Sequence, residues 1–193
     1  MLSCHSSTNF QWYVLFMKTL KVITEPDKRL RKKSEPVHDF DDQLIQFSED
    51  MLATMYKEKG IGLAAPQVNK PIRLIVLDIS ENRDEPLVFV NPIIDSHQGS
   101  VDSNEGCLSV PDIKADVKRF ESILFSAQSI RGKNISFTAD GLLSVCIQHE
   151  IDHLDGKLFI DQISDIKLQR IRKKIKKQKK AEAIEKQNNA RII

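Results

Sequence analysis

The amino-acid sequence predicts an α+β domain in which mixed and antiparallel strands pack around a central helix, followed by a C-terminal helix. Three observations carry this prediction. Apolar residues recur at helical spacing before residue 60, segments rich in β-branched residues fill much of the range 73–137, and two more helical stretches follow residue 140. A chain of 193 residues is long enough for one domain with its own hydrophobic core.

The first helix is predicted within residues 39–59. Leu44, Phe47, Met51 and Met55 recur at spacings of three and four residues, which gives the segment one apolar face. The acidic residues at its start suit the positive end of a helix dipole. Gly60 provides a stop, so the segment has the pattern of an amphipathic helix with defined ends.

Strands are predicted for "RLIVLDI" at 73–79, for "PLVFVNPII" at 86–94 and for most of 115–137. The tripeptide "RGK" at 131–133 has the composition of a short hairpin connection. The segment "SVDSNEGCLSVPD" at 100–112 is expected to be a loop. A helix from Gly141 to about Leu154 and a last helix from about Ser164 complete the expected elements.

The domain is expected to span residues 17–164, because Met17 has the features of a natural start and residues 1–16 resemble an extension outside the domain. No stretch reaches the roughly 18 consecutive apolar residues of a membrane span. Three cysteines, an odd number, argue against a disulfide framework. We therefore expect a protein of the reducing cytoplasm that contacts no membrane.

Charge is divided unevenly along the chain. Residues 165–193 carry 11 Lys and Arg against 3 Asp and Glu, whereas the remainder carries 18 against 24. This basic helical tail predicts a polyanionic partner such as RNA, and a merely solvated helix end is the alternative.

The stretch "QHEIDH" at 148–153 has the pattern of a helical metal site. Residues four apart lie on one face of a helix, so His149 and His153 can point at one ion. Glu150 is then placed to act on a metal-bound water instead of binding the metal. The central helix is therefore predicted to bind a metal.

The third ligand is not the nearby Cys146. Cys146 and His153 lie seven residues apart, about 10.5 Å along a helix, which is too far for one ion to join both ends. Cys107, next to Gly106 in the predicted loop, would complete a Cys-His-His set with a fourth position open for water, as in catalytic sites. An acidic third ligand remains the alternative, from the set Asp161, Asp165, Glu182 and Glu185.

Three segments together resemble the peptide deformylase family, bacterial enzymes that remove the formyl group from nascent chains. They are "GIGLAAPQ" at 60–67, "EGCLS" at 105–109 and "QHEIDH" at 148–153, in family order, and the resemblance runs from about Met17 to Ser164. One departure is Lys59, where relatives often have an acidic residue. It bears on the rim of the site and leaves the metal set intact.

The resemblance implies a role for each motif. The metal would be held by Cys107, His149 and His153, with Glu150 as general base and acid while metal-bound hydroxide attacks the formyl carbon. The side chain of Gln67 and the backbone N–H of Leu108 would stabilise the oxyanion. Fe(II) is the expected metal, Zn(II) is the alternative, and Ni(II) or Co(II) could replace it in purified protein.

The resemblance also implies a substrate pocket. Its members would be Gly62 and Ile61, which meet the extended substrate backbone, then Glu105 and Gly106, and a methionine-pocket wall formed by Leu142, Val145 and Cys146. Plain core packing is the alternative for the last three residues.

The expected partners are formyl-methionyl nascent peptides and, through the basic tail, the ribosome surface; no DNA contact is expected. Two other functions agree less well with the sequence. A metallopeptidase that cuts internal peptide bonds does not suit the Cys107 thiolate as an upstream ligand. A nucleic-acid-binding protein with a structural metal would need a fourth protein ligand, which the sequence does not offer.

Overall fold

The computed structural model describes residues 18–189, so the predicted extension, residues 1–16, lies outside the described residues. The elements follow one another as η1 (Lys28–Arg31), α2 (Asp42–Lys57), β1 (Gly62–Ala64), η2 (Ala65–Val68), β2 (Leu74–Leu77), β3 (Leu87–Gln98), β4 (Val101–Cys107), β5 (Val110–Arg119), β6 (Ser122–Gln128), β7 (Asn134–Asp140), α3 (Gly141–Leu154), η3 (Phe159–Gln162) and α4 (Asp165–Asn189). Here η marks a short 3₁₀ helix.

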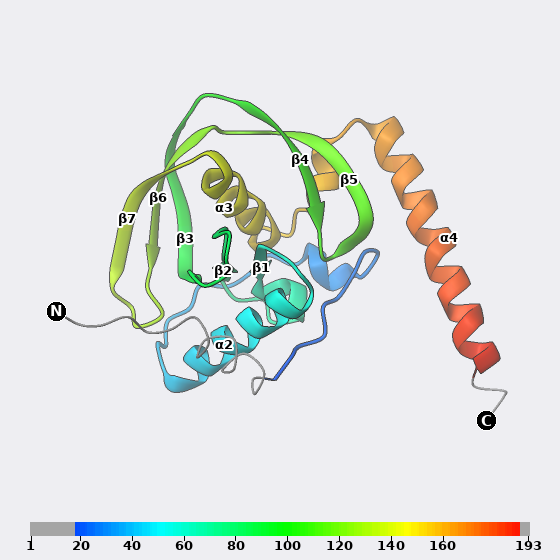
Figure 1. The fold of residues 1–193 in the computed structure, drawn as a ribbon, viewed down its shortest axis with the longest axis horizontal. Helices are drawn as coiled ribbons and strands as arrows, with labels where there is room; N and C mark the ends of the chain where they lie inside the picture. Colours follow the sequence, from blue (N-terminus) through cyan, green and yellow to red (C-terminus); the bar gives the residue numbers. More distant parts are fainter. Residues whose placement is uncertain (1–17, 190–193) are drawn as a thin grey trace.

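Two sheets surround α3 (Figure 1). The larger sheet has the order β1-β2-β3-β6-β7, and the smaller one pairs β4 with β5. Each ladder between these strands is antiparallel, and an isolated bridge between Glu35 and Ile72 is parallel. The chain passes from the smaller sheet to the larger one through residues 120–121, which form a corner between β5 and β6. The predicted α+β class, with strands around a central helix, is confirmed.

The prediction of a loop at 100–112 was wrong, because β4 and β5 occupy most of this range. Along β4 most side chains are exposed or half-buried, and only Glu105 is buried. Such a strand lacks the apolar alternation by which half-buried strands are recognised, although its backbone pairs fully from Val101 to Gly106. The strand is held by its ladder to β5, which a sequence pattern does not report.

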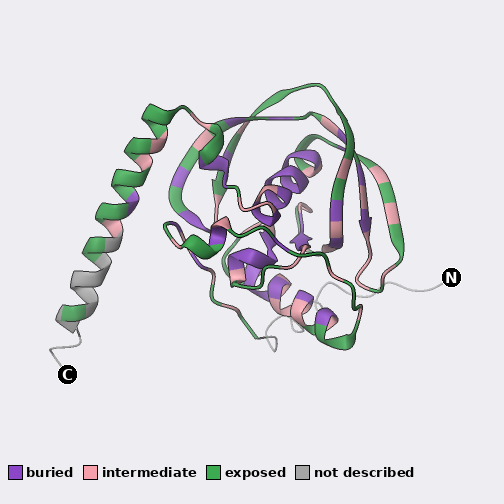
Figure 2. Cartoon of the chain, turned by 180° about the vertical axis from the view of Figure 1, so that it is seen from behind, coloured by how far each residue is buried: buried purple, intermediate pink, exposed green. Residues whose placement is uncertain are grey.

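The helix α3 forms the centre of the core. Ten of its residues are buried, on all sides of the helix (Figure 2). Phe125, Ile123 and Ile75 of the larger sheet belong to the same core cluster as Ile147 and Ile151 of the helix. A helix enclosed in this way holds any polar side chain on it away from bulk water.

The helix α2 covers the larger sheet at β1 and β2. Its predicted apolar face is confirmed, since Met51 and Met55 are fully buried. The side chain of Asp41 caps the helix by accepting a hydrogen bond from the backbone N–H of Leu44 at 2.9 Å. The helix ends at Lys57, three residues before Gly60.

The helix α4 extends away from the sheets along much of its length (Figure 1). Ile175 is nevertheless buried in a cluster with Val110 and Ile113 of β5 and Phe159 of η3. The predicted C-terminal helix is confirmed, and its first half is attached to the smaller sheet. No helix within residues 18–189 combines the length and the apolar composition that crossing a bilayer requires.

Candidate metal centre

Three potential metal ligands meet between α3 and the end of β4. One donor atom from each of Cys107, His149 and His153 lies within 4.8 Å of the others. The Sγ of Cys107 is 3.2 Å from Nε2 of His153, and the two imidazole rings are 5.0 Å apart between centroids. The structure therefore brings together the three residues that the sequence predicted, and Cys146 is outside this group.

The donor set suits a divalent metal. One thiolate and two imidazoles are ligands that Zn(II) and Fe(II) accept, and three protein ligands leave a coordination position for water or substrate. Among the described residues, three buried side-chain polar atoms lack a hydrogen-bond partner, and one of them, Oε2 of Glu150, belongs to a residue that lines the cavity beside this centre. Buried polar atoms without protein partners are expected where another group binds.

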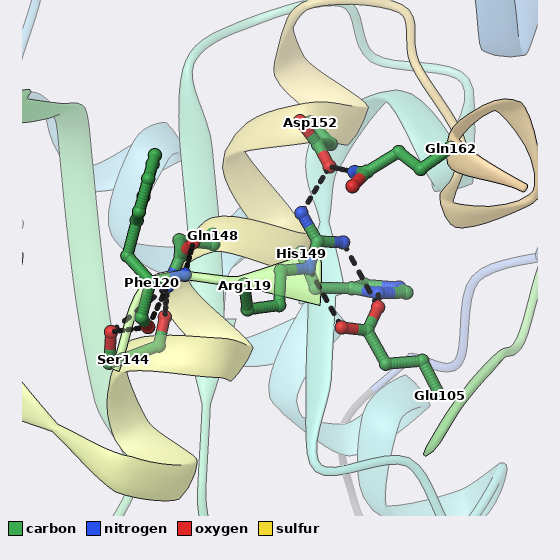
Figure 3. A network of polar contacts seen from close by, with 8 residues as sticks. All are labelled: Glu105, Arg119, Phe120, Ser144, Gln148, His149, Asp152 and Gln162. Carbon is green, nitrogen blue, oxygen red and sulfur yellow. Dashed lines mark hydrogen bonds and ion pairs between the residues drawn. The ribbon is translucent and has the colours of Figure 1, made fainter. Parts of the chain in front are cut away.

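A carboxylate orients the first histidine. Nδ1 of His149 lies 2.8 Å from Oε2 of Glu105, so the ring can donate its N–H there and direct Nε2 toward the metal position. Arg119 holds the same carboxylate at 2.7 and 3.0 Å, and its third nitrogen bonds Asp152 at 2.6 Å (Figure 3). Burial favours the neutral acid, but the bonds from His149 and Arg119 outweigh it and lower the pKa of Glu105.

The pKa values of the two histidines are shifted in opposite directions. Burial lowers the pKa of His153 well below its usual value, and the neighbouring His149 lowers it further. Burial also acts against a charged His149, but its hydrogen bonds to Cys107 and Glu105 raise its pKa well above the usual value. The raised pKa favours a protonated His149 in the metal-free protein, so metal binding at this ring would release a proton.

Glu150 lies against Gly62 of β1. Its side chain is buried, and a Cβ atom built on Gly62 would collide with its carboxylate. Burial raises the pKa of Glu150 to about 7, and the positive charge on His149 offsets part of that rise. A carboxyl group that titrates near neutral pH is suited to exchange protons with a reacting molecule.

Gln67 approaches the same centre from η2. Its Nε2 lies 3.5 Å from Sγ of Cys107 and donates to Oγ of Ser109 at 3.1 Å. Its Oε1 accepts from the backbone N–H of Ala64 at 2.8 Å, so the amide is held with its donor end toward the metal group. The residues after Cys107 form the turn from β4 to β5, and Leu108 packs near Gly60.

A cavity of about 1020 Å³ opens over this centre. Its walls come from the start of β1, from the β4–β5 turn and from α3, and they include every residue of the predicted pocket: Ile61, Gly62, Glu105, Gly106, Leu142, Val145 and Cys146. Glu105 reaches the cavity with its carboxylate already bonded to His149 and Arg119. Leu142 is 54% exposed at the mouth, whereas Val145 and Cys146 are buried in the wall.

Sequence reasoning missed three residues of this centre. Arg119 and Asp152 hold the carboxylate network, and Ser109 bonds Gln67. Ser109 is the last residue of the segment "EGCLS", and Asp152 lies inside "QHEIDH". Their positions in these motifs were therefore a signal by which both residues could have been found. Arg119 belongs to no motif, and a buried arginine at the end of a polar strand leaves no pattern in the sequence.

Comparison with known proteins gives one consistent result. The family model described as polypeptide deformylase matches residues 19–169. A peptide deformylase of Pseudoalteromonas translucida is 52% identical over 164 residues, 85% of this chain and 98% of that protein. One of Tolumonas auensis is 51% identical over 161 residues, 83% of this chain and 96% of that protein.

Solved structures agree with these relatives. A crystal structure of a peptide deformylase from Legionella pneumophila superposes with a TM-score of 0.81 at 44% identity, covering 86% of this chain and 98% of that one. One from Synechococcus elongatus in complex with actinonin gives 0.77 at 40% identity, covering 81% and 90%. The Cys-His-His group, the cavity above it and these likenesses lead to one assignment: the chain belongs to the polypeptide deformylase family of hydrolases.

Proposed function

We propose that this chain hydrolyses the N-terminal formyl group of formyl-methionyl nascent peptides and releases formate, with Cys107, His149 and His153 as its metal ligands. Membership of a metal-dependent deformylase family supports the reaction. The observation that carries the residue assignment is the Cys-His-His group, whose donor atoms lie within 4.8 Å of one another, with the buried Glu150 carboxyl next to His149.

In this proposal each side chain has one task. When bound, the metal supplies a Lewis acid for the water and for the formyl carbonyl. Glu150 accepts a proton from the attacking water and later delivers it to the leaving amine. Nε2 of Gln67 and the backbone N–H of Leu108 donate to the oxygen on which negative charge develops; one such donor contributes about 3 kcal/mol to transition-state stabilisation.

The substrate is proposed to lie extended in the cavity. The backbone of Ile61 and Gly62 borders the cavity beside the free edge of β1 and offers polar groups to a peptide chain. Leu142, Val145 and Cys146 form an apolar wall that suits a methionine side chain. Glu105 and Gly106 also border the cavity, and Glu105 acts through its hydrogen bond to His149.

Fe(II) is the metal that we propose for the cell, with Zn(II) as the alternative and Ni(II) or Co(II) as ions that purified protein can carry. The single thiolate explains an expected sensitivity to oxygen, because both Fe(II) and the Cys107 sulfur can be oxidised. The cytoplasm, where nascent chains emerge, is the proposed location.

The central experiment is an anaerobic assay of formate release from formyl-Met-Ala-Ser, combined with metal analysis. We expect one divalent ion per chain and efficient release, and we expect Glu150→Ala to lose the activity while it retains the metal. Fully metallated wild-type protein that releases no formate would contradict the proposal. Cleavage of unformylated peptides at internal bonds would instead favour a metallopeptidase.

The basic tail is proposed to dock the enzyme on the ribosome. Lys173, Lys176, Lys177 and Lys180 are exposed on α4, whereas Ile175 attaches the helix to the core. Reversing these four charges to Glu tests the proposal without removing Ile175. Salt-sensitive ribosome binding should be lost while activity on small peptides persists, and ribosome binding equal to the wild type would refute it.

A further inference from the structure

The corner between the two sheets presents two backbone groups to α3. Phe120 directly follows the last residue of β5, and one more residue separates it from β6. It therefore belongs to neither ladder. Its backbone N–H and C=O therefore take no partner from a neighbouring strand, although both are strong hydrogen-bonding groups. Both groups find their partners on one helix.

Gln148 supplies the partners for both groups. Its Oε1 accepts from the backbone N–H of Phe120 at 2.9 Å, and its Nε2 donates to the backbone C=O of Phe120 at 2.9 Å (Figure 3). The side-chain amide therefore replaces the peptide group that a neighbouring strand would offer. Its Nε2 also bonds the Oγ and the backbone C=O of Ser144, which fixes the side chain on its own helix.

Gln148 is the middle member of a polar stripe along α3. Ser144, Gln148 and Asp152 follow at intervals of four residues and so lie on one face of the helix. Ser144 donates to the C=O of Phe120 at 3.0 Å, and Asp152 accepts from the guanidinium of Arg119 at 2.6 Å. Ser144 and Gln148 thus contact Phe120, and Asp152 contacts Arg119, the last residue of β5.

This stripe lies beside the metal-ligand face of the same helix. His149 follows Gln148 directly, and His153 follows Asp152. The third ligand, Cys107, is on β4, whose ladder with β5 runs to the pair Val101–Arg119. The corner is at one end of this ladder and Cys107 is at the other, so the β4–β5 ladder connects the Phe120 contact of α3 with the third ligand.

We propose that Gln148 is a positioning residue for the metal centre: its amide clamps Phe120, holds α3 in register with the smaller sheet and so presets the Cys107–His149–His153 geometry. This inference rests on the proposed metal set. Gln148 is not among the residues that line the cavity, and it is not one of the three proposed ligands. Its effect is transmitted through the helix backbone and the β4–β5 ladder.

The chain contains a matched control. Oδ1 of Asn91 accepts from the backbone N–H of Val37 at 2.8 Å, and its Nδ2 donates to the C=O of Val37 at 2.8 Å. A side-chain amide therefore pairs with both backbone groups of one residue here as well, but on Val37, away from the Cys-His-His group. Asn91 has a φ of +52°, so Asn91→Ala adds backbone strain and should destabilise the fold at least as much as Gln148→Ala.

The test measures metal affinity and the Co(II) spectrum of folded protein. Competition with a chelator gives the Zn(II) dissociation constant, and the thiolate-to-Co(II) charge-transfer band reports the ligand geometry. We expect Gln148→Ala to weaken Zn(II) binding roughly 10-fold and to alter that band, because supporting partners outside the ligand set affect metal affinity on this scale. Asn91→Ala should leave both unchanged.

Gln148→Glu keeps the size of the side chain and the acceptor for the Phe120 N–H but lacks the donor for its C=O. Because a carboxylate oxygen then faces that C=O, Gln148→Glu should also weaken Zn(II) binding and alter the band, and it carries the test if Gln148→Ala does not fold. Wild-type affinity and spectrum in both Gln148 variants would overturn the inference, as would an equal loss in Asn91→Ala. Wild-type protein that binds no metal would instead contradict the proposed metal set.

Discussion

Gly62 lies so close to Glu150 that a Cβ atom on the glycine would overlap the carboxylate. These residues come from β1 and α3, 88 positions apart in the sequence. The missing side chain at residue 62 is therefore part of what allows Glu150 to occupy its place beside the metal group. A glycine within a strand often marks such a close approach.

The variant Gly62→Ala should consequently impair catalysis more than stability. The flexible end of Glu150 can move aside, so the fold survives, but a carboxylate displaced by about 1 Å can cost on the order of 100-fold in rate. Formate release should fall while metal content and thermal midpoint stay near wild-type values. Wild-type kcat in Gly62→Ala would show that the Glu150 position is not critical.

The raised pKa of Glu150 predicts a pH-dependent stability in metal-free protein. The folded state holds this proton up to pH about 7, whereas the unfolded state loses it near the usual glutamate pKa of 4.5. The folded state therefore binds more protons between these values, and the free energy of unfolding falls as pH rises through this window.

Glu150→Gln removes this dependence. The difference in the free energy of unfolding between Glu150→Gln and the wild type should therefore change in favour of Glu150→Gln from pH 5 to pH 8. The change should be on the order of 3 kcal/mol for this shift in the pKa of Glu150. Urea unfolding of both metal-free proteins at the two pH values measures the change. A constant difference between them would mean that Glu150 titrates near its ordinary value.

Glu105→Gln should weaken metal binding about 10- to 100-fold, because the carboxylate orients His149 and is itself held by Arg119. Asp102→Asn is a suitable control on the same strand, since its ion pair with Lys118 is largely exposed and contributes little. Chelator competition on folded protein compares the metal affinities of the wild type, Glu105→Gln and Asp102→Asn. Equal weakening by both variants would point to a general disturbance of β4.

The two described cysteines should behave in opposite ways. Cys107→Ser should lose or greatly weaken the metal, whereas Cys146→Ser should retain it. Burial raises the pKa of the Cys146 thiol to about 12, so it should be alkylated slowly at pH 8. Mass spectrometry of metal-free protein treated with iodoacetamide measures this rate, and rapid labelling of Cys146 would contradict the buried placement.

Local patterns in the sequence were sufficient for the helices. The apolar spacing of Met51 and Met55 located α2, and the four-residue spacing of His149 and His153 placed both on one face of α3. The length of a helix also excluded Cys146 as a ligand. In each case the residues whose spacing carried the prediction lie within about two turns of the same helix.

Relationships across the fold could not be predicted in this way. β4 was missed because its outward side chains are polar and its stability comes from the ladder to β5. Arg119 was missed because its partners, Glu105 and Asp152, lie 14 and 33 residues away. Only the folded chain shows that one guanidinium joins a strand to the helix that carries both histidines.

Cys107 and His153 lie 46 residues apart and belong to different structural layers, one to the smaller sheet and the other to the central helix. An ion bound by both would therefore act as a cross-link. It closes a long loop of the chain, and loop closure restricts the unfolded state more than the folded one. The ion proposed to serve the chemistry would thus also tether the smaller sheet to the core, and its removal should loosen that sheet before the rest of the domain.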